Sequence, residues 1–426
     1  MLLKTIQVFT IRGFGSVASF LVTLVLSHVT TPERVGVFMI SLAVMHVLGG
    51  VATIGSQTAL IKVVASNVDK PWTRINQDQS FVIKAVSLLS VLVMVLFLFF
   101  PEYIAKLIGE EAMSEILSLV SFGVFLVAMI QVLAALLIGK QKPIFGTLVQ
   151  NVISQVFFIV VCLIASFNGL ELNSSQLLVI YLSGLFISLV SGGLFWFSDE
   201  RAMFIYNSQI HPELRNSVSA LFIILLMGLC VQWAGQFASA RFLDAKSIAY
   251  FSVAQRTALL ASFVLIAVNL VVVPKIAAEF SKGRLEEVDR LSLTSSRLMV
   301  ALAIPVLIIM LLFPEFLMGL FGTDYKVAAE SLQVMAVGQF INVITGSVGY
   351  LLNVTGHERD MRNVVILSGV LAVILAFTFT YLFGILGAAY ATAIALASQN
   401  LIAAWMVKKR LGFNTLNIFR RLDVHQ

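Results

Sequence analysis

The sequence predicts an all-α integral membrane protein with twelve transmembrane helices, and three observations lead to this class. The 426 residues are 59% hydrophobic and 12% charged, with a mean hydropathy of +0.98, whereas a soluble domain carries about 25% charged residues. Apolar runs long enough to cross a bilayer recur along the whole chain. The Lys and Arg residues cluster on alternate connections between these runs, which indicates an even number of spans.

The apolar runs leave no room for a soluble catalytic domain beside the helices. Each run is about 20 residues or more, the length that crosses a hydrocarbon core. The twelve helices are expected near residues 6–28, 35–60, 80–100, 115–138, 146–167, 176–197, 216–240, 247–273, 293–313, 328–353, 364–384 and 387–407.

The basic residues orient these helices. Of the 28 Lys and Arg residues, 21 lie on the side that holds both termini, five lie on the opposite side, and Arg12 and Arg256 lie inside helices. Both termini are therefore predicted to be cytoplasmic. The net charge of +6 is a topology signal, and a nucleic-acid partner is not expected, because the basic residues flank helices one or two at a time. Residues 281–297 mix both signs and are predicted to form an amphipathic helix on the membrane surface.

An internal repeat divides the chain into two lobes. Residues 100–109, FPEYIAKLIG, align with residues 313–322, FPEFLMGLFG, at an offset of 213. This offset corresponds to six helices, so two parallel six-helix repeats are expected: an N-lobe at 1–200, a cytoplasmic linker at 201–215, and a C-lobe at 216–426 with a short cytoplasmic tail. Repeats of this kind build transporters whose site lies between the halves.

The N-terminus and the cysteines indicate no further covalent feature. Arg12 interrupts the apolar core that a signal peptide would need, so the first helix is expected to stay attached. Cys162 and Cys230 both lie in apolar segments, which argues against a disulfide framework or a metal cluster. No metal and no cofactor are predicted.

Two arginines inside helices are the predicted binding residues. Arg256 lies about 13 Å into its predicted helix at 1.5 Å per residue, and we expect it to face a cavity, the alternative being a hydrogen bond to neighbouring carbonyls. Arg12 lies about two turns in, where snorkelling to the interface competes with a cavity position. The predicted spans contain no carboxylate at membrane depth. Arginine without an opposing carboxylate suits a diphosphate, whose oxygens a guanidinium binds in pairs.

An amide and aromatic face is the predicted sugar contact. Gln232 and Gln236 are four residues apart and share a helix face with Trp233 beside it. The alternative is that such amides join packed helices by hydrogen bonds. The other polar residues in spans that are candidates for sugar binding are Gln57, Asn269, Gln339 and Asn342.

Four stretches resemble the polysaccharide-biosynthesis flippases. They are IAYFSVAQRTALLASFVLIAVNLVVVPKIAAEFSKGRLEEV (248–288), TPERVGVFMISLAV (31–44), VGQFINVITGSVGYLLNVTGHE (337–358) and ILGAAYATAIALASQNLIAAWMVKKRLG (385–412). The chain resembles the Wzx-type O-antigen and capsule repeat-unit translocases of the multidrug/oligosaccharidyl-lipid/polysaccharide (MOP) exporter superfamily. The resemblance implies a V-shaped two-lobe fold with a central cavity. It also implies a bacterial inner-membrane location and transfer of undecaprenyl-diphosphate-linked oligosaccharide to the periplasmic leaflet.

The resemblance also implies roles for the two arginines. In the related lipid II flippases, arginines on the first and eighth helices meet the diphosphate, and Arg12 and Arg256 lie on those helices here. The chain departs from those flippases in having twelve predicted spans instead of fourteen, and in lacking an arginine at depth in the second helix.

The predicted function is a flippase that works by alternating access and is not an enzyme. The expected partners are a lipid-linked oligosaccharide, membrane lipid, a polysaccharide polymerase and a chain-length regulator. An ion-coupled multidrug or small-molecule antiporter is the alternative within transport, and it would need a carboxylate inside the membrane. A polymerase or glycosyltransferase would need longer outer loops than the chain has, and a scaffold of a glycan-assembly complex is a further alternative.

Overall fold

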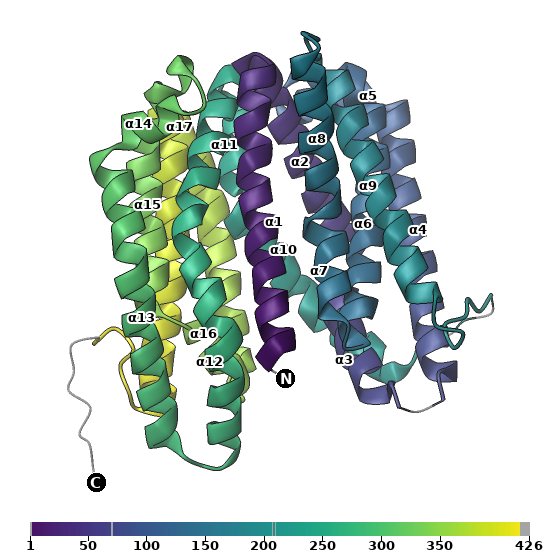
Figure 1. The fold of residues 1–426 in the computed structure, drawn as a ribbon, viewed down its shortest axis with the longest axis vertical. Coiled ribbons are helices and arrows are strands. Elements are labelled where there is room, and N and C mark those ends of the chain that lie inside the picture. The colour runs from purple at the N-terminus through teal and green to yellow at the C-terminus, as the bar shows by residue number, and fades with distance from the viewer. Residues whose placement is uncertain (1, 70, 207, 209, 418–426) are drawn as a thin grey trace. The chain divides into compact units, whose positions relative to one another are not determined.

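The computed structural model describes residues 2–69, 71–206, 208 and 210–417, and in these ranges the regular elements are all helices (Figure 1). The contacts divide the chain into two compact units. Unit 1 comprises Met1–Leu229 and Gln236–Ser252, and unit 2 comprises Cys230–Gly235 and Val253–Gln426. The lobe boundary at residues 201–215 stays a prediction.

The helices follow one another along the chain with short connections. In order, they are α1 (Leu2–Val29), α2 (Pro32–Ala52), α3 (Ser56–Asn67), α4 (Thr73–Phe99), α5 (Pro101–Ile108), the 3₁₀ helix η1 (Glu111–Ile116), α6 (Leu117–Gly139), α7 (Pro143–Asn151), α8 (Ile153–Phe167), α9 (Ser174–Phe197), α10 (Pro212–Phe242), α11 (Ala245–Leu259), η2 (Leu260–Ser262), α12 (Phe263–Ser281), α13 (Leu285–Leu312), α14 (Pro314–Gly319), η3 (Thr323–Ala328), α15 (Ala329–Thr345), α16 (Val348–Val354) and α17 (Glu358–Leu411).

The prediction of an all-α membrane protein is confirmed. Ten helical segments among the described residues are long and apolar enough to cross a bilayer. One of them, α17, has 54 residues and consists of two helices joined by a kink at Gly384, where φ is 62° and ψ is −138°. The first predicted span lies within α1. Each of the twelve predicted runs thus coincides with a helix, half of a kinked helix, or a pair of consecutive helices.

Helix α6 forms the core of unit 1. It packs against α2, α3, α4, α7 and α9, and 78% of the residues in its span are buried, compared with 22% in α4. A helix that is apolar on all sides is expected to be surrounded by other helices, and α6 has this composition. Helix α4 instead leaves most of its apolar side chains at the surface of the unit.

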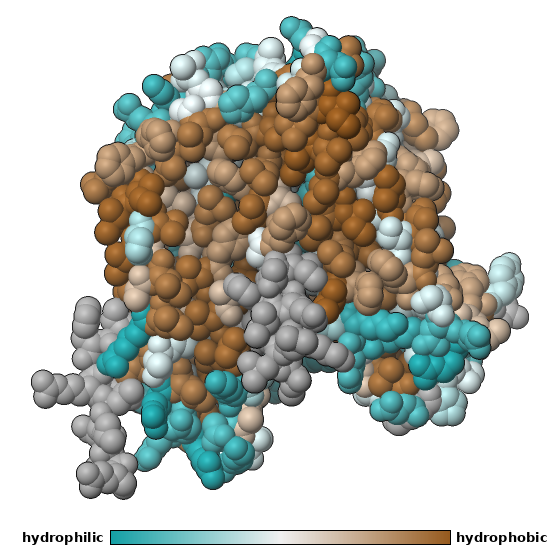
Figure 2. Space-filling model, viewed as in Figure 1, coloured by the Kyte–Doolittle hydropathy of each residue, from teal (hydrophilic) through white to brown (hydrophobic). Residues whose placement is uncertain are grey.

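Helix α15 has the corresponding central place in unit 2. It packs against α13 and α17, while α12 packs against α13. Buried apolar residues from α12, α13 and α15 meet in one cluster, formed by Val268, Met299, Ala303 and Val343. Figure 2 shows hydrophobic side chains over the middle of the helices of each unit and hydrophilic ones at the helix ends, as expected for membrane spans.

The sequence repeat is a repeat of local structure. Phe100 and Phe313 precede the prolines of the two FPE motifs and have nearly the same backbone angles, φ −129°, ψ 47° and φ −127°, ψ 43°. Each motif begins a short helix, α5 or α14, which is followed by a 3₁₀ helix and then by the central helix of its unit, α6 or α15. Proline at the first helical position explains why a new helix starts there.

The structure corrects two predictions about helix continuity. Four predicted single spans are each broken into two helices, at α2/α3, α7/α8, α11/α12 and α15/α16. The prediction of a separate surface helix at 281–297 is wrong, because residues from Leu285 onward belong to the continuous 28-residue helix α13. Its first turns are polar because they lie at the end of the span, and buried serines such as Ser292 and Ser296 pack inward.

Candidate functional site

The two predicted diphosphate ligands lie on helices of different units. Arg256 is half-buried on α11, eleven residues after its start at Ala245, or about 16 Å along the helix. Arg12 lies on α1, and its side chain falls outside the described side chains. The diphosphate role of both residues stays a prediction.

The amides on α10 differ in their surroundings. Gln236 is buried, Trp233 is half-buried and Gln232 is exposed. The backbone carbonyl of Gln232 accepts a hydrogen bond of 3.3 Å from Gln255 Nε2. Since Gln255 precedes Arg256, this bond fixes α10 beside the part of α11 that carries the arginine. The predicted amide face therefore has one exposed member, Gln232, whose backbone is bonded to the neighbour of the predicted arginine.

Gln57 lies at the break between α2 and α3. Its Nε2 donates to Gln131 Oε1 on α6 at 2.5 Å and to Thr53 Oγ1 at 3.2 Å. The break contains Ile54 with φ 51° and Gly55 with φ 72°, and a left-handed conformation is sterically unfavourable for a β-branched residue such as Ile54. The bond across to α6 is the interhelical contact that the alternative interpretation predicts.

The C-terminal amides surround the break between α15 and α16. Ser347 Oγ donates to Asn269 Oδ1 of α12, and both residues are buried. Gly346, with φ 73° and ψ −147°, ends α15. Asn342 Nδ2 donates to Gln339 Oε1 on the same helix at 3.4 Å, so this predicted pair does share a polar face. Asn269 thus has a structural partner, whereas sugar binding by any of these residues stays a prediction.

One buried carboxylate lies in the first turns of a candidate span. Helix α4 begins at Thr73 instead of near residue 80, so Asp78 belongs to this helix, with only 1% of its surface exposed. Asp78 Oδ1 accepts from the backbone N–H of His211 at 3.0 Å and lies 3.0 Å from its Nδ1. Arg74 Nε lies 3.9 Å from Asp78 Oδ2. With these partners in the first turns of α4, Asp78 fixes the polar end of the helix.

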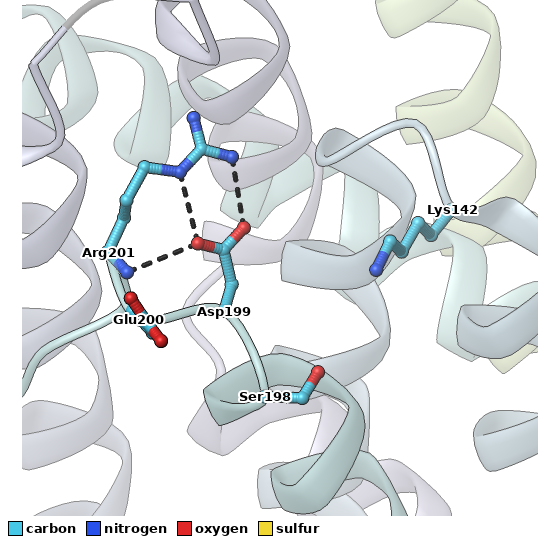
Figure 3. A pocket seen from close by; sticks show the side chains of 5 residues that line it. All are labelled: Lys142, Ser198, Asp199, Glu200 and Arg201. Atoms are coloured by element: carbon cyan, nitrogen blue, oxygen red, sulfur yellow. Dashed lines mark hydrogen bonds and ion pairs between the residues drawn. The ribbon is translucent and has the colours of Figure 1, made fainter.

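A polar hollow of about 490 Å³ lies at the end of α9 and is lined by Lys142, Ser198, Asp199, Glu200 and Arg201 (Figure 3). Arg201 Nε and Nη2 each donate to Asp199 at 3.0 Å. Lys140 Nζ lies 2.8 Å from the same carboxylate. The hydrogen bond from Arg201 and then that from Lys140 hold the pKa of Asp199 well below its usual range. Both oxygens of the Asp199 carboxylate are therefore engaged by Arg201 or Lys140.

Sequence reasoning missed the residues that pair with the predicted ones. Gln131 is an amide in the apolar run that forms α6, and that isolation was a usable signal. Ser347 and the ion cluster around Lys140 gave no such signal, because their partners are far away in the sequence. Among the described residues, no group of three or more His, Cys, Asp or Glu side chains could hold a metal ion.

Comparisons with known proteins give the fold and the family. A family model described as polysaccharide biosynthesis protein matches residues 2–280, and the MatE family model matches residues 221–378. No curated protein matches the chain.

Several solved structures share the fold. A structure of the lipid II flippase MurJ in an inward closed conformation is 17% identical, with a TM-score of 0.74 over 96% of this chain and 88% of that chain. An inward-facing multidrug resistance MATE family transporter of the MOP superfamily is 13% identical, with a TM-score of 0.76 over 96% and 98% of the two chains. A MOP superfamily transporter from Pyrococcus furiosus, described as having a binding pocket of reversed polarity, is 13% identical, with a TM-score of 0.67 over 98% and 96%.

Because these sequence identities are low, the structural matches show only that the fold is shared. The polysaccharide biosynthesis family model, in contrast, covers more than half of the sequence. The chain therefore belongs to the polysaccharide biosynthesis protein family.

Proposed function

We propose that the protein is a Wzx-type flippase of the bacterial inner membrane with both termini in the cytoplasm. It moves an undecaprenyl-diphosphate-linked oligosaccharide repeat unit, of O-antigen, capsule or exopolysaccharide, from the cytoplasmic to the periplasmic leaflet by alternating access. The N-lobe at 1–200 and the C-lobe at 216–426 are the moving parts. A polysaccharide polymerase and a chain-length regulator then act on the exported unit.

Arg256 is the observation that carries this proposal. It is a permanent charge about 16 Å along a helix that belongs to a candidate span. An ionisable residue at depth in a bilayer costs about 2.5–3.5 kcal/mol on insertion scales, and it therefore faces a partner or a cavity. A planar guanidinium binds phosphate oxygens in pairs. In a family described by polysaccharide biosynthesis, a lipid diphosphate is the anion that best fits such a residue.

The remaining predicted ligands complete the site. Arg12 on the first helix is the second cation for the diphosphate. Sugar hydroxyls and ring faces are received by the amides and the indole of Gln57, Gln232, Trp233, Gln236, Asn269, Gln339 and Asn342. Amides both donate and accept hydrogen bonds, as sugar hydroxyls require.

Deletion of the gene tests the substrate class. We expect loss of the surface polymer together with accumulation of undecaprenyl-diphosphate oligosaccharide in the cytoplasmic leaflet, measured by extraction of lipid-linked intermediates. An unchanged polymer and unchanged intermediates would refute the flippase proposal.

Substitution of Arg256 tests the binding role separately. Loss of a hydrogen bond to a charged group costs about 1.5–3 kcal/mol, so Arg256→Ala should lower flipping about 10- to 100-fold at equal expression. Arg256→Lys should retain part of the flipping activity, because the positive charge remains although the planar guanidinium, which binds two oxygens at once, is lost. Arg290→Ala is the matched control, because Arg290 is 66% exposed on α13 and pairs with Glu287. A normal amount of surface glycan in the Arg256→Ala strain would refute the proposal that Arg256 binds the diphosphate.

An ion-coupled multidrug or small-molecule antiporter is the second candidate. The MatE family model matches residues 221–378, and a multidrug MATE transporter shares the fold. A deletion strain that keeps its polymer but becomes sensitive to cationic compounds would favour this function over the flippase.

A further inference from the structure

Part of the segment that connects α9 to α10 is hydrogen-bonded to α4. Asn76 of α4 holds it on both sides: Asn76 Nδ2 donates to the carbonyl of Arg201 at 2.9 Å, and Asn76 Oδ1 accepts from the backbone N–H of Met203 at 3.1 Å. We call residues 201–206 the strap. In Figure 1 they belong to the teal loop beside the lower part of α4.

The next turn of α4 continues this pattern. Gln79 Nε2 donates to the carbonyl of Met203 at 2.9 Å, and the backbone N–H of Ile205 donates to Ser80 Oγ at 2.9 Å. Asn76, Gln79 and Ser80 are each at most 5% exposed. Because buried polar groups are costly unless they are paired, the strap and the polar side of α4 stabilise each other.

Lys84 binds the end of the strap. Its Nζ donates to the carbonyl of Ile205 at 3.2 Å and to the carbonyl of Tyr206. The same Nζ lies 5.3 Å from the centroid of the Phe204 ring and 5.0 Å from that of Tyr206. Both distances fall within the range of a cation–π interaction. The two rings are therefore held above the ammonium group.

The strap continues the apolar face of α4. Lys84 is one turn before Leu88 and two turns before Leu92, so the three side chains share a helix face. Leu88 is 71% exposed and Leu92 is 54% exposed. Since α4 is a candidate span, this face is covered by lipid. The strap therefore lies at the end of a lipid-covered stripe, close to where the hydrocarbon core ends.

The strap also presents apolar side chains to its surroundings. Met203 is 62% exposed, Phe204 is 52% exposed and Tyr206 is 84% exposed. Aromatic rings with a polar atom prefer the interface between hydrocarbon and water. In water, the same three side chains would form an apolar patch on a loop whose backbone is otherwise fixed by buried bonds.

We propose that the strap lies in the headgroup region of the bilayer on the side where α4 begins, with Tyr206 as the interfacial anchor and Phe204 as an apolar contact beside it, both seated on Lys84. The connection between the predicted lobes is then a membrane-bound element of unit 1. The lipid interface is its partner because the strap extends the lipid-covered stripe of α4 without interruption. The inference does not depend on which substrate the protein carries.

Nitroxide accessibility in lipid nanodiscs tests this proposal on the full chain. In a background with Cys162 and Cys230 replaced by Ala, Tyr206→Cys is labelled and its collisions with oxygen and with a water-soluble nickel chelate are compared. Glu200→Cys is the matched control, because Glu200 is an exposed residue of the same segment that lines the polar hollow. We expect the ratio of oxygen to nickel accessibility to be at least threefold higher at position 206 than at position 200.

A ratio at position 206 equal to or below that at position 200 would overturn the proposal and leave the patch facing water, where a soluble protein could bind it. Asn76→Ala in the Tyr206→Cys background provides a second measurement. It removes the two bonds from Asn76 to the strap, so the label should become more mobile and at least twofold more accessible to nickel. An unchanged spectrum would count against these bonds as the contacts that position the strap.

Discussion

Replacement of Asp199 by Asn tests an ion pair of unit 1 whose lysine is buried. Lys140 Nζ lies 2.8 Å from Asp199 Oδ2, and the lysine side chain is 5% exposed. The same Nζ lies 5.2 Å and 5.3 Å from the ring centroids of Trp72 and Trp196, which stack on each other. The ammonium group therefore has a carboxylate on one side and two indoles beside it, with little access to water.

The geometry gives the size of the effect. Two unit charges 2.8 Å apart attract by about 6 kcal/mol at an effective dielectric constant of 20, and desolvation of both groups offsets much of this. Removing one partner of a buried pair costs about 3–5 kcal/mol, because the other charge is left uncompensated. The indole faces retain about 1 kcal/mol of the attraction on Lys140. We therefore expect Asp199→Asn to lower the free energy of unfolding by about 2–4 kcal/mol.

Thermal unfolding in detergent, followed by tryptophan fluorescence, measures this loss. At about 2–4 °C per kcal/mol for a unit of this size, the Tm of Asp199→Asn should fall by roughly 4–16 °C. Arg201→Ala is the control: its side chain is 56% exposed, so its loss leaves Lys140 paired and should shift the Tm much less. Lys140→Met combined with Asp199→Asn should lose less than the sum of the single variants. Equal shifts for Asp199→Asn and Arg201→Ala, or strict additivity, would refute the reasoning.

Two further predictions concern unit 1. A Cβ on Gly36 would lie 1.7 Å from the backbone carbonyl oxygen of Ala245, so Gly36→Ala should cost more than the roughly 1–3 kcal/mol of ordinary overpacking. Yield of folded protein after size-exclusion chromatography measures it, and Gly193→Ala, which has nothing within 4 Å, should fold normally. The second prediction is a pH dependence. Because the folded-state pKa of Asp199 is lowered, its contribution is complete above the unfolded value of about 3.9 and is lost as the pH falls below it. The Tm difference between wild type and Asp199→Asn should therefore stay constant from pH 8 to 5 and shrink below about pH 4; a difference that shrinks between pH 7 and 5 would contradict this assignment.

The sequence was sufficient to locate the long apolar helical segments and their order, because apolar length is a property of the chain itself. The FPE motifs also predicted matching structure, because proline at a first helical position acts locally. The start of α4 was not predictable in this way. Residues 73–79, TRINQDQ, have the composition of a loop, and they are helical because the strap and His211 satisfy Asn76, Asp78 and Gln79 from a segment about 125 residues away.

The helix breaks were missed for a related reason. Glycine at 384 gave a local signal, and the predicted boundary between the last two spans falls there. The break before α3 includes Ile54 with φ 51°, a conformation that a β-branched residue adopts only when the surrounding structure imposes it. Likewise, the hydrogen bond between the side-chain amides of Gln57 and Gln131 depends on how α3 packs against α6. The sequence of either helix alone does not contain this information.

The positions of the polar side chains relative to these breaks decide which of them is the better functional probe. A break removes backbone groups from the helical hydrogen-bond ladder, and in a membrane neighbouring side chains must replace the missing partners. Gln57 bonds across the helix interface beside one break, and Asn269 bonds Ser347 directly after another. Substituting either one leaves a buried or half-buried partner unpaired and lowers stability, so a transport defect in such a variant does not separate binding from folding. Arg256 lies within α11, three residues before its end. A transport defect in Arg256→Ala at an unchanged Tm would separate ligand binding from folding, whereas the same defect in Asn269→Ala, with a lowered Tm, would not.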